Sequence, residues 1–321
     1  MSANAQERGR GFGAILLSVL LALMAMVPLA ATAGAQATPA AEATPVAADL
    51  GLEFPEIEIR AQETNYSITV PAPVAAGPHL VRFVNQTDVV ADANLVLLPE
   101  DRTSGDLSGA LVTAFTGESG AEFPDWFDEA TFVGGSWADA QGTNEVVLNL
   151  TPGRYYVFTS NPSRAQSVQA FTVVTPEEAA GEPAPATPTA SPSASPVAEA
   201  LPSDVQVSAT EFEFSGAELA STGTQLWQVT NDGENIHNAV LVGGDDVDEE
   251  AGTAAAESLA SGESAEDGEI VGAVGILSPA QTAYMLLDLE AGGHALVDTL
   301  PDPDSGDLNI GEGMVAVVEV E

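Results

Sequence analysis

Apolar and polar residues alternate in many short stretches of the chain from residue 51 onward, and turns rich in Gly, Asn and Asp separate these stretches. A period of two is typical of strands that bury one face and expose the other. No sustained helical period interrupts the pattern, although Gly105–Phe115 and Glu249–Ser261 could each form a short helix within a longer insertion. The pattern therefore predicts an all-β protein of antiparallel sandwiches with short helical insertions.

The same order of strands occurs twice, and this internal repeat is the strongest organisational signal in the sequence. Matching stretches agree in spacing and in alternation. The matching pairs are Gly77–Asn85 with Gly223–Asn231, Ala93–Leu98 with His237–Val242, Glu145–Thr159 with Tyr284–Asp298, and Val168–Val174 with Met314–Val320. We therefore expect two tandem copies of one sandwich.

Two Pro-, Ala- and Thr-rich segments, 38–50 and 176–202, interrupt the alternation. Such compositions bury too little apolar surface to offset the entropy lost on ordering, so both are predicted to be extended, mobile tethers. They leave a first domain at residues 51–175 and a second domain at 203–321. Because the linker offers no apolar surface and both domains are acidic, we expect them to be energetically independent. The chain is expected to be a monomer.

Residues 1–37 have the features of a secretory signal peptide. Arg8 and Arg10 precede the apolar run Phe12–Ala30, and small residues with Ala-x-Ala spacing follow it. The run is also long enough for a retained membrane anchor, but the cleavage sites favour export to the cell envelope or the extracellular space. No later stretch is apolar enough to span a bilayer. The absence of cysteine excludes a lipid-attached lipoprotein and any disulfide.

The composition is strongly acidic, with 48 Asp and Glu against 7 Lys and Arg and a formal net charge of −41 at pH 7. Nucleic acids and anionic membrane surfaces are disfavoured as partners, because both are bound through Lys and Arg. Such acidity is typical of a heavily hydrated surface, with a cation-collecting role as the alternative. The expected partner is an extracellular protein, a glycan or a cation.

One segment carries the resemblance to a known family. Val229–Val242 predicts a strand, a polar turn and a second strand that begins at His237 and Asn238. Together with Asn231 and the later Gly313–Met314 step, this segment resembles the copper-binding frame of the cupredoxins, which hold type 1 copper in a small Greek-key β-sandwich. The resemblance covers both halves of the chain and implies two tandem cupredoxin-like domains.

The resemblance also implies that the copper site of the second domain is degenerate. Type 1 copper needs two imidazoles, a thiolate and usually a weak thioether. His237 and Met314 match the first histidine and the methionine of the family, whereas Asp298 stands at the cysteine position and Asn309 at the second histidine position. The corresponding residues of the first domain offer no ligand set; they are Ala93, Thr159, Ser163 and Val168.

Two functions remain open. We expect a secreted, non-enzymatic binding or structural module that has lost type 1 copper, because the sequence has no nucleophile elbow, phosphate loop or zinc-protease motif. The alternative is a copper-binding or electron-transfer protein with a residual site at His237, Asp298, Asn309 and Met314. One imidazole and one carboxylate make a weak site, so we expect no cofactor or at most weakly bound copper. Asn238 and Asn94 are expected to brace neighbouring turns.

Overall fold

Strands form in all the matching stretches of the predicted repeat. The computed structural model describes residues 46–115, 124–160, 168–181, 200–244, 247–265, 268–302 and 305–321. The expected signal peptide at residues 1–37, most of the two expected tethers, and Ser163 lie outside these described residues. Within the described ranges, no helix is long and apolar enough to cross a membrane.

The first half of the chain, residues 51–175, contributes strands β1 to β9. Their bounds are β1 (Glu56–Ala61), β2 (Tyr66–Thr69), β3 (Val74–Ala75), β4 (Gly77–Asn85), β5 (Ala91–Leu97), β6 (Thr131–Ala138), β7 (Thr143–Leu150), β8 (Gly153–Phe158) and β9 (Gln169–Val174). The insertion between β5 and β6 carries the helix α2 (Ser104–Phe115), close to the predicted bounds, and the short 3-10 helix η1 (Asp125–Glu129).

The second half, residues 203–321, contributes strands β10 to β17. Their bounds are β10 (Val205–Thr210), β11 (Glu213–Ser215), β12 (Gly223–Asn231), β13 (His237–Gly244), β14 (Glu269–Leu277), β15 (Thr282–Leu289), β16 (Gly292–Val297) and β17 (Val315–Val320). The predicted helix of this half is α4 (Glu249–Ala260), and two short 3-10 helices, η2 (Ala217–Leu219) and η3 (Asn309–Glu312), lie in connections.

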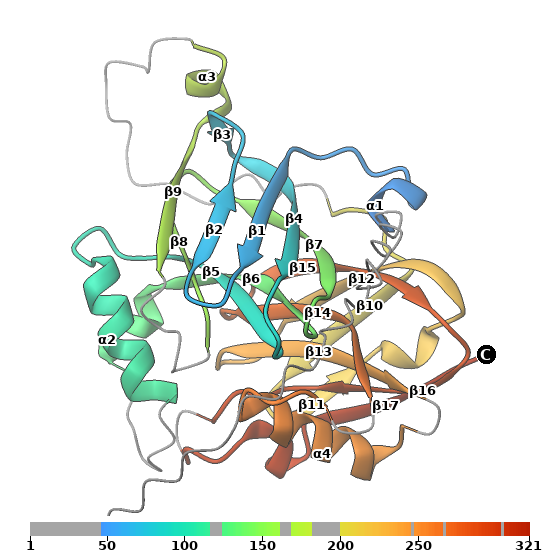
Figure 1. Ribbon diagram of the computed structural model, residues 1–321. Helices are drawn as coiled ribbons and strands as arrows, with labels where there is room; N and C mark the ends of the chain where they lie inside the picture. The colour runs from blue at the N-terminus through green and yellow to red at the C-terminus, as the bar shows by residue number, and fades with distance from the viewer. Residues whose placement is uncertain are drawn as a thin grey trace, which may run out of the picture. The chain divides into compact units, whose positions relative to one another are not determined.

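The two halves have the same strand order, which confirms the predicted repeat and the all-β sandwich fold (Figure 1). The order β2, β1, β4, β7 corresponds to β11, β10, β12, β15, and β6, β5, β8, β9 correspond to β14, β13, β16, β17. The expectation of purely antiparallel sheets is wrong, because β1 pairs in parallel with β4, and β10 with β12. In each half a hairpin takes the chain to the sheet edge before it returns beside the first strand.

The two halves join along a seam at which their strand edges pair. β7 pairs with β15, with Val146 opposite Met285, and β6 pairs with β14 through Val133 and Leu277. The sheets therefore run through both halves, one with eight strands and one with nine among the described residues. Pairing at the seam satisfies backbone donors and acceptors that would otherwise form exposed edges.

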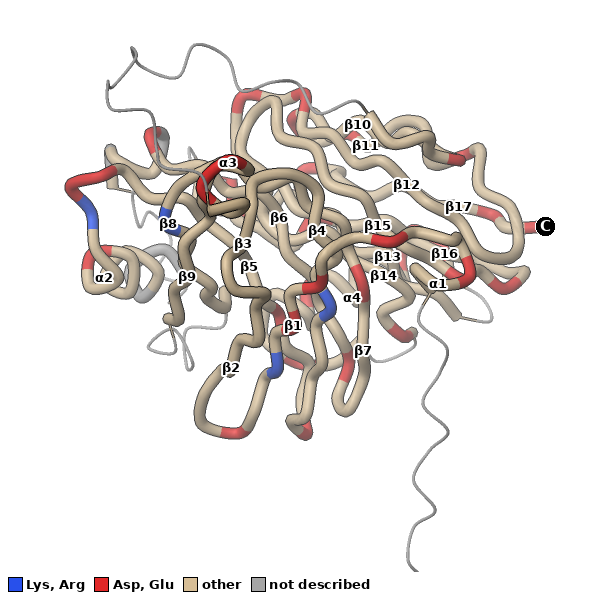
Figure 2. The backbone as a smooth tube through the Cα atoms, turned by 90° about the horizontal axis from the view of Figure 1, so that it is seen from above, with Lys and Arg blue, Asp and Glu red and all other residues tan. Residues whose placement is uncertain are grey.

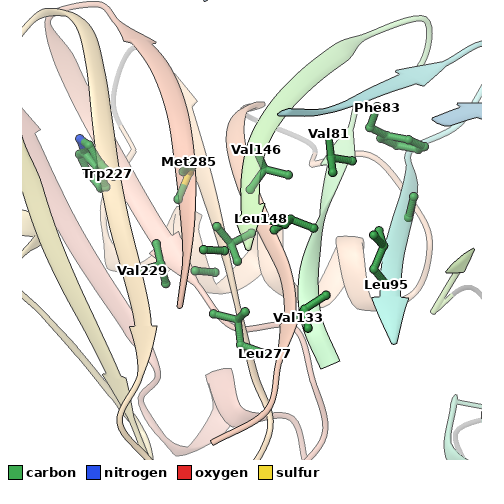
Figure 3. Packing of buried hydrophobic residues seen from close by; sticks show 14 of the residues in the cluster. Val81, Phe83, Leu95, Val133, Val146, Leu148, Trp227, Val229, Leu277 and Met285 are labelled. Carbon is green, nitrogen blue, oxygen red and sulfur yellow. The ribbon is translucent and has the colours of Figure 1, made fainter. Parts of the chain in front are cut away.

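Buried side chains on either side of the seam form one continuous core. Leu148 on β7 and Met285 on β15 belong to a single buried cluster that extends from Phe83 in the first half to Trp227 in the second (Figure 3). Residues Thr44–Glu321 form one compact unit. The expectation of energetically independent halves is wrong, because burying this shared apolar surface stabilises the joined state.

A close backbone approach at the seam requires glycine. Gly275 of β14 lies against Gly135 of β6, and a Cβ at Gly275 would collide with Asn94 Oδ1 and approach the Gly135 backbone. The same oxygen of Asn94 accepts a hydrogen bond from the Ile276 backbone N–H at 2.9 Å. Asn94, which we expected to tie neighbouring turns together, instead links the two halves.

Helices cover the outer faces of the sheets. Ala256 and Leu259 of α4 pack on β13 and β16, and α2 packs with η1 on the first half, where Phe127 joins a buried aromatic cluster. Asp and Glu outnumber Lys and Arg along the described backbone, as Figure 2 shows. The surface is thus acidic while the interior is apolar.

Short parts of both expected tethers are helical instead. In the first tether, α1 (Val46–Asp49) buries Ala47 against the eight-stranded sheet. At the start of the linker, α3 (Pro176–Ala179) is capped by Thr175, whose hydroxyl and backbone N–H both bond to Glu178. These residues depart from the expectation because α1 finds an apolar surface to cover and α3 has a complete capping box.

Candidate functional site

The four residues predicted to form the site of the second half lie at the ends of adjacent strands. His237 is the first residue of β13, Asp298 follows the last residue of β16, and Met314 precedes β17. Asn309 begins η3. Because β16 pairs antiparallel with both β13 and β17, the three strand ends lie at the same end of the sheet.

The structure brings the polar members of this set together around the Asp298 carboxylate. Asp298 Oδ2 is 2.8 Å from His237 Nδ1, within hydrogen-bond distance, and it also accepts a hydrogen bond from Asn309 Nδ2 at 3.0 Å. Asp298 Oδ1 accepts a third hydrogen bond from the Leu300 backbone N–H at 2.8 Å. We call His237, Asp298 and Asn309 the carboxylate cluster.

The backbone of Met314 closes the frame of this cluster. Its carbonyl accepts a hydrogen bond from the Asp298 N–H at 3.3 Å, and its own N–H donates to the Asn309 carbonyl at 3.1 Å. Gly313 has a φ of +108°, a left-handed conformation that glycine adopts at little cost. The Met314 side chain is fully buried in the main core.

Burial dominates the electrostatics of the carboxylate cluster. The side chains of His237, Asp298 and Asn309 are at most 2% exposed. Burial raises the pKa of Asp298 above its ordinary value, and the hydrogen bond and charge of His237, the Leu300 N–H and the Asn309 amide act in the opposite direction. Three donors on one carboxylate form the arrangement that makes a buried carboxylate tolerable.

The other edge of the His237 ring faces the turn between β10 and β11. Its Nε2 is 3.9 Å from Glu211 Oε1, an ion-pair distance if the ring is protonated. Glu211 Oε1 also accepts hydrogen bonds from the backbone N–H groups of Glu234 and Asn235. The Nε2 atom is buried and has no hydrogen-bond partner within the described ranges. Sequence reasoning missed Glu211, because nothing in its local pattern distinguishes it from the many other acidic residues.

Asparagine side chains fix the turns that present the cluster. Asn238 Nδ2 donates to Thr299 Oγ1 at 2.8 Å, and Asn238 Oδ1 accepts from the Thr299 N–H at 3.0 Å, which confirms the predicted bracing role. Asn231 Nδ2 donates to the carbonyls of Asn235 and Leu277 at 2.7 and 2.9 Å. The turn before His237 and the turn after Asp298 are therefore both held by side-chain amides.

The corresponding positions of the first half do not form such a cluster. Ala93 is buried in β5, and Val168 packs beside the cluster that holds α2. The side chains of alanine and valine contain no atom that can bind a metal. Thr159 directs its hydroxyl to Asp92, a residue that the sequence comparison did not single out. Ser163 lies outside the described residues.

Asp92 is a second buried carboxylate, and it is 1% exposed. Besides Thr159, the Ser160 backbone N–H donates to it at 2.8 Å and Asn94 Nδ2 at 2.6 Å. Burial raises the pKa of Asp92, while these donors lower it. The available signal was an acidic residue in the middle of the otherwise apolar run Val89–Ala93.

The donor set of the second half does not fit type 1 copper. The chain has no cysteine, so the thiolate that defines such a site is missing. The imidazole nitrogen that faces the site, His237 Nδ1, is already engaged with Asp298. No group of three or more His, Cys, Asp or Glu side chains is placed to hold a metal ion in the part of the chain that the structure describes.

Comparisons with known proteins bear on the fold. No family model and no curated protein matches the sequence. Reduced auracyanin from Roseiflexus castenholzii matches with 20% identity, 36% of this chain, 94% of that chain and a TM-score of 0.29. Cu-containing nitrite reductase from Thermus scotoductus SA-01 matches with 12% identity, 83% of this chain, 61% of that chain and a TM-score of 0.22. Blue copper oxidase from Nitrosomonas europaea matches with 10% identity, 83% of this chain, 85% of that chain and a TM-score of 0.20.

The two halves share one sandwich topology, as expected for two tandem copies of one domain. The expectation of a non-enzymatic protein is not upheld, and two solved structures that match over 83% of this chain are a nitrite reductase and a blue copper oxidase. At identities of 10 to 20% the likeness concerns the fold alone. No activity, substrate or copper content is carried over to this chain.

Proposed function

We propose that this two-copy cupredoxin-like chain is an exported binding module in which the carboxylate cluster replaces the type 1 copper site of the second half. The observation that carries the proposal is the double use of Asp298 Oδ2, which is within hydrogen-bond distance of both His237 and Asn309. Metal ligands bind through lone pairs, and hydrogen bonds already engage the lone pairs at the former cysteine position. Hydrogen bonds, rather than a metal ion, hold the site together.

The cluster connects the strand ends that a metal would connect in this frame. Asp298 connects the end of β16 to the start of β13 through His237 and to η3 through Asn309. The backbone bonds of Met314 add β17 to the same junction. Hydrogen bonds therefore hold the turns at this end of the sheet together without a cofactor.

Export and partner choice rest on the sequence. The Ala-x-Ala sites in residues 1–37 support cleavage and release, and the net charge of −41 supports a monomeric chain whose partner is an extracellular protein, a glycan or a cation. Intact-mass analysis of the extracellular fraction should give a chain that begins near Thr38. A secreted chain that retains residues 1–37 would contradict this part of the proposal.

A second candidate function is copper binding or electron transfer at a residual site. One observation favours it: His237, Asp298, Asn309 and Met314 do converge at one end of the sheet. Copper would then have to displace the proton shared between His237 and Asp298 and recruit the buried Met314 thioether.

Metal analysis of the purified protein separates the two functions. We expect substoichiometric copper, no intense visible band after Cu(II) addition, and a thermal midpoint that neither chelator nor copper changes, because only a ligand that binds the folded state raises it. The matched control is His237→Gln, which removes the imidazole. Stoichiometric copper that is lost in His237→Gln would overturn the proposal in favour of the copper protein, whereas copper that persists in His237→Gln is bound elsewhere.

A further inference from the structure

An apolar patch lies across the seam on the outer face of the eight-stranded sheet. Its side chains come from the four neighbouring strands β4, β7, β15 and β12; they are Leu80, Val147, Tyr284, Leu286 and Leu226. Residues 46–54 and Leu201 cover this patch, and α1 contacts β15 (Figure 1). All five patch side chains are buried as a result.

The covering segment has little structure of its own. α1 has four residues, and the N–H groups of Leu50, Gly51 and Leu52 bond back to carbonyls within residues 46–48. A single turn is unstable alone in water, because nucleating a helix costs more than one turn regains. Docking on the sheet therefore holds the segment in its conformation.

Both halves supply the docking surface. The Ala47 N–H donates to Glu145 Oε2 on β7 at 3.1 Å, and the apolar contacts include Val147 on β7 together with Tyr284 and Leu286 on β15. Leu201, at the far end of the linker, donates its N–H to Tyr284 Oη at 3.0 Å. A surface made of β7 and β15 exists only once these two strands have paired across the seam.

We propose that residues 46–54 form a detachable latch, which docks after the two halves have joined and opens without unfolding either sheet. Opening is local because β4, β7, β15 and β12 pair with one another through their own backbone hydrogen bonds. Segments with few buried contacts are the ones that open below the global unfolding free energy. The latch is independent of the copper question, since no residue of the carboxylate cluster touches it within the contacts described above.

Hydrogen exchange on the unmodified chain gives the first test. The latch amides of Leu50, Gly51 and Leu52 should exchange through an opening that denaturant accelerates only weakly, because this opening exposes much less surface than global unfolding does. Amides of β7 and β15 should exchange only through the global, denaturant-sensitive reaction. If the latch amides follow the same denaturant dependence as β7 and β15, the segment is part of the cooperative core and the proposal is wrong.

A pair of variants in the full chain gives the second test. Leu50→Asp with Leu52→Asp places two charges on latch residues that pack against the patch. Leu219→Asp, at a leucine that is 69% exposed, is the matched control. The first variant should speed exchange in residues 46–54 by at least about tenfold, which corresponds to about 1.4 kcal/mol. It should also increase the binding of an apolar dye, while the control should change neither.

Protection of β7 and β15 decides the outcome of the second test. Protection that stays within about twofold of the unmodified chain supports the latch, since the sheets beneath then survive its opening. Unchanged exchange in residues 46–54, or equal loss of protection in the latch and in both strands, overturns it. Glu145→Gln, which keeps the shape of the side chain and weakens only the bond to Ala47, repeats the test with a milder change.

Discussion

Removal of the His237 imidazole measures how strongly the carboxylate cluster is held by its direct hydrogen bond. His237→Leu keeps much of the side-chain volume but deletes the Nδ1 atom that lies 2.8 Å from Asp298 Oδ2. The buried carboxylate keeps the hydrogen bonds from Leu300 and Asn309. Breaking a buried pair by removing one partner costs about 3–5 kcal/mol, and the two remaining donors place the expected loss at about 3 kcal/mol.

The loss should be visible in both chemical and thermal unfolding. One kcal/mol shifts the thermal midpoint by about 2–4 °C in a chain of this size class, so about 3 kcal/mol predicts a fall of about 6–12 °C. A double-mutant cycle with Asp298→Asn isolates the pair itself. Because the neutral amide no longer needs the imidazole, the double variant should lose at least about 1 kcal/mol less than the sum of the single variants.

His294→Leu is the matched control for this experiment. His294 is a buried histidine of the same half, and its Nδ1 lies 3.2 Å from the Gly292 carbonyl rather than beside a carboxylate. Urea unfolding of the full chain, followed by circular dichroism, gives each free energy of unfolding. Equal losses for the two histidine variants, or strictly additive losses in the cycle, would show that the contact between His237 and Asp298 contributes nothing specific.

Three further predictions address the seam, the first half and the expected copper-ligand positions. Gly275→Ala should lower the free energy of unfolding by about 1–3 kcal/mol, because the added Cβ meets Asn94 Oδ1, and urea unfolding measures it. Burial raises the pKa of Asp92 in the folded state, so its ionisation opposes folding as the pH rises from its ordinary value of 3.8 through the raised value. As the pH rises through this range, the Asp92→Asn variant should therefore gain stability relative to the unmodified chain. Unfolding experiments at a series of pH values measure this, and a difference in free energy of unfolding that does not change with pH would contradict the reasoning. Asp298→Cys with Asn309→His should give an intense visible band with Cu(II), since it restores a thiolate and a second imidazole; a colourless double variant with an intact circular dichroism spectrum would mean that these positions are wrongly assigned.

Local alternation was sufficient to place most strands. Gly77–Asn85 and Gly223–Asn231 coincide with β4 and β12, because buried and partly exposed side chains alternate in the second part of each strand and the sequence shows this alternation directly. The short helices that the two insertions could form are α2 and α4. The comparison with the copper-binding frame pointed to His237, Asp298 and Asn309, and the fold brings these three residues together, since they lie at strand ends and in a turn.

Other features depend on which surfaces meet in three dimensions. The resemblance places Asp298 where a cysteine is expected, but only the structure shows its carboxylate engaged by His237, Leu300 and Asn309. Only the structure pairs Asp92 with Thr159. The composition of the linker predicted independent halves, whereas β7 and β15 pair across the seam and residues 46–54 cover it. Strand edges carry the same backbone donors and acceptors in every sequence, so alternation tells which face of a strand is buried but not which edge will pair with it.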